Sequence, residues 1–170
     1  MKIAVLTLSR MGDILLAAPF LERLSRIYPK CELHLIVPKP FQEVGQGMRV
    51  ARVHTIDTDS LILAAGKHDS LIELYHKVRE ELSDLLMLEF DKVYNLGYDL
   101  TSAIIAHLIP GEVGGGLYLD KDGKRRIAGD WSRMAMTSHL ARGLNPFHLA
   151  DLQLGIAGRH EGRTQVARFT

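Results

Sequence analysis

The segment Ser9–Asp13 (SRMGD) brings a hydroxyl, a guanidinium, a glycine and a carboxylate together in one short stretch. It lies between an apolar run and a longer amphipathic run, where a strand would pass into a helix. Gly12 permits a tight turn and the close approach of a ligand. Asp13 falls at or near the N-cap of the helix, where free N–H groups and the helix dipole stabilise a carboxylate by about 0.3–1 kcal/mol. Such a carboxylate is either a cap alone or a general base for a bound hydroxyl.

A second polar group follows another predicted strand. Asn95 lies near the end of the run 90–96, and Asp99, Thr101 and Ser102 come shortly after the run. Because the carboxyl ends of parallel strands meet at one edge of a sheet, we expect this group on the same edge as Asp13. These side chains can bind the hydroxyls of a ligand. The alternative is that they cap the helix beginning at Leu100, which is the role expected for Asp99.

Basic side chains supply a third candidate group. Lys124, Arg125 and Arg126 (KRR) lie in a loop or near its ends, and arginine binds carboxylates and phosphates well. The alternative for these residues is a solvated basic loop. Arg10 is placed within the first turn itself, where it either binds an acidic ligand or pairs with Asp13 or another carboxylate.

The elements that must position these residues alternate between strands and helices. Strands are predicted at 2–8, 32–37, 53–57 and 90–96, and helices at 14–28, within 60–88 with a break near 66–70, and at 100–108. This order predicts an α/β fold, a Rossmann-like parallel sheet with helices on both faces. After Gly111 we expect a hairpin or an irregular loop, followed by helices at 131–142 and about 148–157.

Composition narrows the class of protein. The chain has 170 residues, 46% hydrophobic and 24% charged, which fits one globular domain, and its net charge of +1 gives no overall preference for nucleic acid. No signal peptide or membrane-spanning run is visible, and a single cysteine favours a reducing compartment, so a cytoplasmic location is expected.

The eight histidines show no metal-ligand spacing, and both G-x-G-x-x-G and G-x-x-x-x-G-K-[ST] are absent. Neither a metal nor a cofactor is predicted.

Three segments resemble glycosyltransferase family 9, the lipopolysaccharide heptosyltransferases. The opening KIAVLTLSRMGDILLAAPFLERLSRIYPKCELHLIV has the family's strand, S-x-x-G-D turn, P-x-L helix segment, YP stop and second strand, through Ser9, Gly12, Asp13, Pro19, Leu21, Tyr28 and Pro29. The segment VYNLGYDLTSAIIAHLIPG is similar to the family's N-L…S-A segment through Asn95, Leu96, Ser102 and Ala103, and NPFHLADLQLGIAG resembles the end of its first domain.

This resemblance implies one half of a GT-B glycosyltransferase. In that fold two Rossmann-like domains face each other, the N-terminal one holding the sugar acceptor and the C-terminal one the ADP-sugar donor. Residues 1–158 then form the N-terminal acceptor-binding domain, and 159–170 form a linker or truncated tail toward a missing donor domain. The implied reaction is an inverting transfer of heptose from ADP-heptose to the lipopolysaccharide inner core, for which this chain alone is expected to be inactive.

The resemblance also assigns roles to residues. It makes Asp13 the catalytic base. The acceptor is expected to contact Ser9, Arg10, Met11, Gly12, Asn95, Thr101, Ser102, Lys124, Arg125 and Arg126. The expected partners are a lipopolysaccharide core acceptor and an ADP-sugar bound by the missing domain, with no nucleic acid. Contact with the cytoplasmic face of the inner membrane and self-association through the uncovered surface are further expectations.

Two other functions remain open from the sequence. One is a stand-alone sugar- or nucleotide-binding Rossmann-like module. The other is a flavodoxin-like receiver domain, which needs an acidic pair at the end of its first strand and a phosphorylatable aspartate after its third. Asp57 or Asp59 would supply that aspartate, but TLSR offers no acidic pair.

Overall fold

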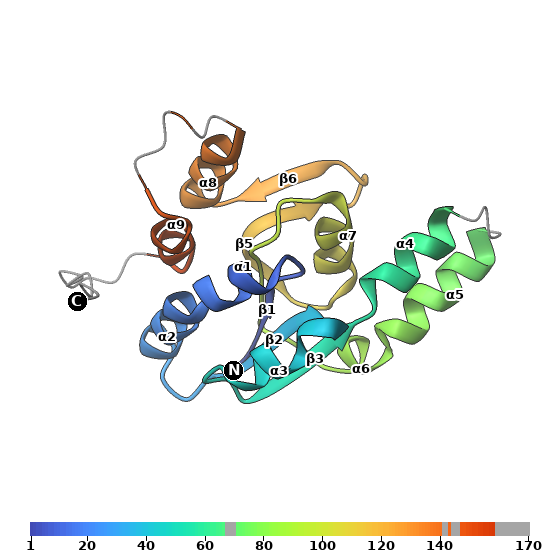
Figure 1. Cartoon of the computed structure of the whole chain (residues 1–170), viewed down its shortest axis with the longest axis horizontal. Helices are drawn as coiled ribbons and strands as arrows, with labels where there is room; N and C mark the ends of the chain where they lie inside the picture. The colour runs from blue at the N-terminus through green and yellow to red at the C-terminus, as the bar shows by residue number, and fades with distance from the viewer. Residues whose placement is uncertain (67–70, 141–142, 144–146, 159–170) are drawn as a thin grey trace.

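The computed structural model describes residues 1–66, 71–140, 143 and 147–158, which form a six-stranded sheet flanked by helices (Figure 1). The strand order is β3-β2-β1-β4-β5-β6. The strands are β1 (Lys2–Leu6), β2 (Glu32–Pro38), β3 (Arg52–Ile56), β4 (Lys92–Asn95), β5 (Glu112–Leu119) and β6 (Arg125–Ala128). All neighbouring pairs are parallel except β5 and β6, which form the hairpin expected after Gly111.

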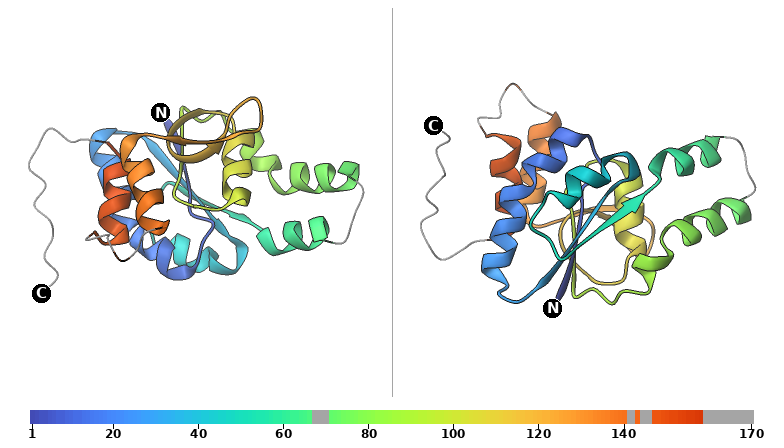
Figure 2. Two further views of the ribbon diagram at one scale, coloured as in Figure 1. Left: turned by 90° about the horizontal axis from the view of Figure 1, so that it is seen from above. Right: turned by 60° about the horizontal axis from the view of Figure 1, so that its bottom comes forward.

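Helices cover both faces of this sheet (Figures 1 and 2). On one face lie α1 (Met11–Leu16), α2 (Ala18–Ile27), the 3₁₀ helix η1 (Lys39–Phe41), α3 (Gln42–Gln46), α8 (Asp130–Leu140) and α9 (Leu149–Ile156). On the other lie α4 (Thr58–Gly66), α5 (Leu71–Glu81), α6 (Ser83–Leu86) and α7 (Leu100–Leu108). The predicted Rossmann-like α/β fold is therefore confirmed. In the described part of the chain, no helix is long and apolar enough to span a bilayer.

The side chains of β1 show why the strand reads as a continuous apolar run. Ile3 and Val5 enter the core under α1, α2, α8 and α9, whereas Ala4 and Leu6 enter the core under α4–α7. All four are fully buried. A strand covered on both faces has no side that faces solvent, so its sequence lacks the alternation of apolar and polar residues that a half-buried strand shows.

Two predicted elements differ from those observed. The helix expected at 14–28 is divided into α1 and α2 at Ala17, because Pro19 has no N–H to donate within the first turn of α2. The glycine run 114–116, read as part of a loop, lies inside β5. There Gly116 has a φ of +97° and a Cβ at this position would collide with the Asn95 carbonyl, so only glycine allows β5 to pair closely with β4.

Some sequence predictions fall outside the described residues. These are most of the break near 66–70, the end of the helix predicted to reach Arg142, and the tail 159–170. The boundary of a domain at residue 158 therefore stays a prediction.

Two histidines form a hydrogen-bonded pair between neighbouring strands. His34 on β2 and His54 on β3 stack with ring centroids 5.2 Å apart, and His34 Nδ1 lies 2.9 Å from His54 Nε2. One neutral ring donates and the other accepts, so the bond requires an uncharged acceptor nitrogen. Burial lowers the pKa of both rings, that of His54 to about 4, although Glu32 near His34 and Asp84 near His54 act in the opposite direction.

This pair makes folding stability depend on pH. Because both folded pKa values lie below the unfolded value, the unfolded chain binds more protons between pH 6.5 and 4, and stability falls as pH drops through that window. We expect a loss on the order of 1 kcal/mol between pH 7 and pH 5, since His54 is partly exposed to solvent. Urea unfolding at the two pH values measures it. His54→Gln should flatten the dependence, whereas the exposed control His76→Gln should leave it as in the wild type.

Candidate functional site

The strand order of this sheet reverses between β1 and β4, which leaves a crevice beyond the carboxyl ends of these two strands. From β1 the chain runs outward to β2 and β3, then returns to β4 on the opposite side of β1. Leu6 and Asn95 are register partners, so the loops after the two strands begin side by side. They then lead into α1 on one face and α7 on the other. Such a reversal of strand order is where ligands bind in open α/β sheets.

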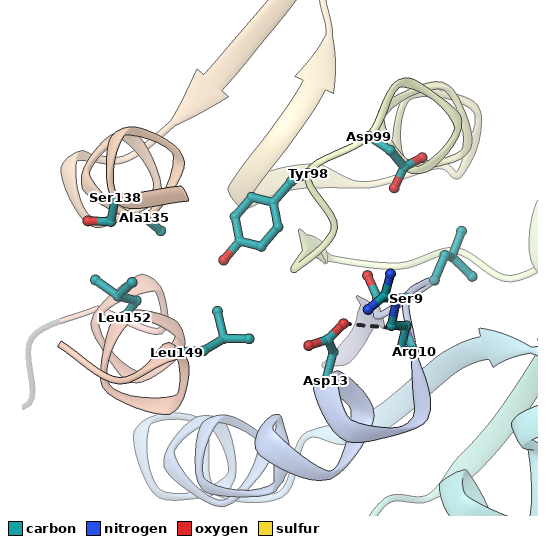
Figure 3. Close-up of a pocket in the computed structure, with 10 residues that line it drawn as sticks. Ser9, Arg10, Asp13, Tyr98, Asp99, Ala135, Ser138, Leu149 and Leu152 are labelled. Atoms are coloured by element: carbon teal, nitrogen blue, oxygen red, sulfur yellow. Dashed lines mark hydrogen bonds between the residues drawn. The ribbon is translucent and has the colours of Figure 1, made fainter. Parts of the chain in front are cut away.

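A pocket of about 980 Å³ occupies this crevice (Figure 3). The loop after β1 and the start of α1 supply one wall, the loop after β4 a second, and helices α8 and α9 a third. The lining residues are Leu8, Ser9, Arg10, Asp13, Tyr98, Asp99, Ala135, Ser138, Leu149 and Leu152. The volume is within the range of small-molecule sites.

Asp13 has both of the roles that its position allowed. Arg10 is the N-cap of α1 and Asp13 the third helical residue, whose Oδ2 accepts a hydrogen bond from the Arg10 N–H at 3.3 Å. The half-buried carboxylate also lines the pocket (Figure 3). Capping therefore fixes the side chain at the place where a ligand hydroxyl would enter, and the two interpretations are compatible.

Ser9 and Arg10 also line the pocket beside Asp13. Arg10 is exposed, and no ion pair joins its guanidinium to any residue that the structure describes. The alternative in which Arg10 pairs with Asp13 is thus not realised through the guanidinium. The guanidinium of Arg10 can therefore bind an anionic group of a ligand in the pocket.

Asn95 and Ser102 are buried and their polar groups are used within the protein. Asn95 Nδ2 donates to the Leu117 carbonyl at 2.7 Å and to Ser102 Oγ at 3.2 Å, and Asn95 Oδ1 accepts from the Gly97 N–H at 2.8 Å. Neither residue, nor Thr101, lines the pocket. The polar atoms of Asn95 and Ser102 hold the loop that carries the pocket residues. A direct acceptor contact by Asn95, Thr101 or Ser102 stays a prediction.

Asp99 caps α7 as expected, accepting a hydrogen bond from the Ser102 N–H at 2.9 Å. It also lines the pocket on the side opposite α8 and α9 (Figure 3). Asp99 is therefore a second carboxylate of the pocket, held by a different helix from the one that holds Asp13.

The remaining predicted contacts lie outside the pocket lining. Met11 and Gly12 are exposed on the first turn of α1, and Lys124, Arg125 and Arg126 belong to the β5–β6 hairpin (Figure 1). Arg126 Nε binds the half-buried Asp120 at 2.7 Å and, with backbone hydrogen bonds, lowers the pKa of that carboxyl. An acceptor contact by these residues stays a prediction, and it would require a ligand that extends beyond the pocket.

Sequence reasoning missed one side chain of the loop and a whole wall of the pocket. Tyr98 stands between Gly97 and Asp99, and its aromatic character after a predicted strand was the signal available. Burial, followed by the charge of Asp13, raises the pKa of Tyr98 to about 12. Ala135 and Ser138 of α8 and Leu149 and Leu152 of α9 come from distant sequence and carried no signal of their own.

Other kinds of site receive no support from the described residues. Within them, no three His, Cys, Asp or Glu side chains gather where they could hold a metal ion. Asp57, the candidate phosphorylation residue of a receiver, accepts a hydrogen bond from the Ser60 N–H at 2.9 Å at the start of α4. It follows β3, the edge strand, away from the pocket between β1 and β4.

The hydrogen bonds of Asn95 allow its structural role to be tested separately from a direct contact with a ligand. Asn95→Ala leaves the Gly97 N–H and the Leu117 carbonyl without a buried partner, so we expect a loss of about 2–3 kcal/mol in the free energy of unfolding. Urea denaturation measures it, with Thr101→Ala on the neighbouring turn as a near-neutral control. A variant as stable as the wild type that no longer binds ligand would instead restore Asn95 as a direct contact.

Comparisons with known proteins point to one group of structures. The E. coli heptosyltransferase WaaC with ADP-2-deoxy-2-fluoro heptose matches with a TM-score of 0.71 at 17% identity, over 97% of this chain and 51% of that chain. WaaC with ADP gives a TM-score of 0.67 at 15% identity over 97% and 50% of the two chains. A glycosyl transferase family 9 structure from Veillonella parvula DSM 2008 gives 0.59 at 20% identity over 91% and 40%.

No protein-family model matches the sequence, and no curated protein matches it. At identities of 15–20%, the structural likeness establishes the fold. The chain spans about half the length of the heptosyltransferase structures whose fold it shares.

Proposed function

We propose that this chain is the acceptor-binding N-terminal half of an inverting, GT-B-type glycosyltransferase of family 9. The observation that carries the proposal is the Asp13 carboxylate, fixed by the Arg10 N–H and lining a pocket at the sheet's switch point. The fold shared with half of WaaC, whose structures hold ADP-2-deoxy-2-fluoro heptose or ADP, supports it. The donor in this proposal is ADP-heptose, and the acceptor is a sugar of the lipopolysaccharide inner core.

The proposed chemistry is a single displacement at the anomeric carbon of the donor. An acceptor hydroxyl in the pocket forms the new C–O bond from one face while the bond to the ADP phosphate breaks on the other. The electron pair of that bond leaves with ADP, and the hydroxyl proton passes to the Asp13 carboxylate. Positive charge developing at the anomeric carbon is stabilised by the same nearby anion.

Ser9 and Arg10 would hold the acceptor next to Asp13. The Ser9 hydroxyl can donate to or accept from a sugar hydroxyl, and the Arg10 guanidinium can bind a carboxylate or phosphate of an acidic core sugar. The donor half would close over the same edge of the sheet. Exposed apolar side chains there, Met11 on α1 and Leu100 on α7, have 50% and 51% of their surface free and would be covered by it.

The proposed acceptor also suggests a cellular location for the reaction. A lipid-linked core sugar would bring the enzyme to the cytoplasmic face of the inner membrane. Without the donor half, the uncovered apolar surface would favour self-association of the chain, which sedimentation at high concentration would detect.

An amide NMR titration of the chain tests the proposal. A soluble inner-core saccharide should shift the amide signals of Ser9–Asp13 and Gly97–Asp99, whereas ADP alone should leave them in place. Shifts caused by ADP alone would assign the pocket to the nucleotide and contradict an acceptor half. A stand-alone nucleotide-binding module would give that second pattern.

Asp13→Asn addresses the base in the two-domain enzyme that this proposal implies. The amide keeps the size of the side chain and an acceptor oxygen for the Arg10 N–H but cannot take up a proton, so turnover should fall by about 10²–10⁴ with acceptor binding retained. Single-turnover transfer from ADP-heptose measures it. Asp99→Asn is the matched control, because asparagine caps a helix equally well, and it should have a much smaller effect.

A further inference from the structure

Gly12 stands on the first turn of α1, one residue before Asp13. It is exposed and lies outside the lining of the pocket, whereas Asp13 points into the pocket (Figure 3). Its backbone is helical, and a Cβ added to it would meet no described atom within 4 Å. Neither the backbone conformation nor close packing among the described residues therefore requires glycine at this position.

Two glycines near the pocket differ from Gly12 in this respect. A Cβ on Gly116 would collide with the Asn95 carbonyl, and a Cβ on Gly155 would collide with the indole of Trp131. Packing inside the protein requires glycine at both of those positions. At Gly12 the fold gains nothing from glycine, which is one of the least favourable residues in a helix because its backbone loses more freedom on folding.

The proposed reaction limits how far the donor sugar can lie from this turn. The acceptor hydroxyl must come within hydrogen-bond reach of the Asp13 carboxylate, about 3 Å, and reacting atoms approach to about 3–3.5 Å before a bond forms. The anomeric carbon of the donor is therefore at most about 6–7 Å from the carboxylate. Because consecutive Cα atoms are only about 3.8 Å apart, the ring that carries this carbon has to lie against residues next to Asp13.

The acceptor and the donor sugar need different sides of Asp13. In the proposed function the acceptor fills the pocket, which Ser9 and Asp13 line. The exposed part of the first turn of α1 carries Gly12 and Met11, and 50% of the surface of Met11 is free. The open space beside Gly12 allows a sugar ring to approach the helix backbone without meeting a side chain.

We propose that the sugar of the donor packs against the backbone of Gly12 while the acceptor is held in the pocket. The absence of a side chain leaves room for the ring, so that the anomeric carbon reaches the hydroxyl whose proton Asp13 accepts. Gly12 is then a specificity position for the transferred sugar, since a larger residue would occupy the space that the ring needs. This inference rests on the proposed function, and it assigns the contact of Gly12 to the donor and not to the acceptor.

Gly12→Ala tests the inference because it adds one methyl group and suits a helix better than glycine. In the two-domain enzyme that the proposed function implies, kcat/KM for ADP-heptose should fall about 10–100-fold, the usual effect of inserting a methyl group into a close contact. Gly12→Val should lower it further. Gly47→Ala adds the same methyl group at the exposed C-cap of α3, and this matched control should behave like the wild type.

Three further measurements separate a contact with the donor sugar from other roles of Gly12. ADP lacks the transferred sugar, so its inhibition constant should be the same for the wild type and Gly12→Ala. The affinity of this chain for a soluble inner-core saccharide, measured by NMR titration, should also be unchanged. A merely structural role would lower the urea midpoint of Gly12→Ala, which we expect to equal or exceed that of the wild type.

Four results would overturn this inference and leave the proposed function standing. They are an unchanged kcat/KM for ADP-heptose, a Gly12→Ala chain less stable than the wild type, an inhibition constant of ADP that rises as much as kcat/KM falls, and weaker binding of the saccharide to Gly12→Ala. A wild-type two-domain enzyme that transfers no sugar from ADP-heptose would overturn the proposed function, and the role of Gly12 with it.

Discussion

The buried amide of Asn95 is the interaction on which the pocket depends. It stands at the end of β4, beside the end of β1, and its three hydrogen bonds reach β5, α7 and the loop between β4 and α7. Each bond replaces one that water would otherwise make, and none can be lost without leaving a buried polar group unpaired. These bonds hold the loop that carries Tyr98 and Asp99 in place at the base of the pocket.

The third wall of the pocket depends on close packing around β5. Gly116 approaches the Asn95 carbonyl at a φ that other residues avoid, and its N–H donates to Ser132 Oγ of α8 at 2.9 Å. Trp131 packs over Gly155, where a Cβ would collide with the indole, and so holds α8 against α9. These contacts bring Ala135 and Leu152 opposite Asp13. The glycines of this region thus shape the pocket although none of them lines it.

Fold and function rest on different observations in this protein. The likeness to WaaC at 17% identity establishes a shared architecture over about half of that enzyme. Shared architecture alone supports many chemistries. Support for glycosyl transfer comes from the site, where a helix-held carboxylate, a cation and a hydroxyl line a pocket whose α8–α9 wall is mostly apolar. A sugar acceptor fits that combination because it offers both hydroxyls and C–H faces.

The sequence by itself determined the local features of the chain. Apolar runs and helical spacing predicted the first four strands, most helices and the fold class. The SRMGD turn placed Ser9, Arg10 and Asp13 at the carboxyl edge of β1, where they line the pocket. Such features depend on neighbours within a few residues, which the pattern of the chain records. Only the tertiary structure decided which way the remaining side chains face. It turned Asn95 and Ser102 inward, left Lys124–Arg126 on a hairpin outside the pocket, and brought Tyr98 together with α8 and α9. Those outcomes come from packing between segments far apart in the chain, for which a single sequence carries no local signal.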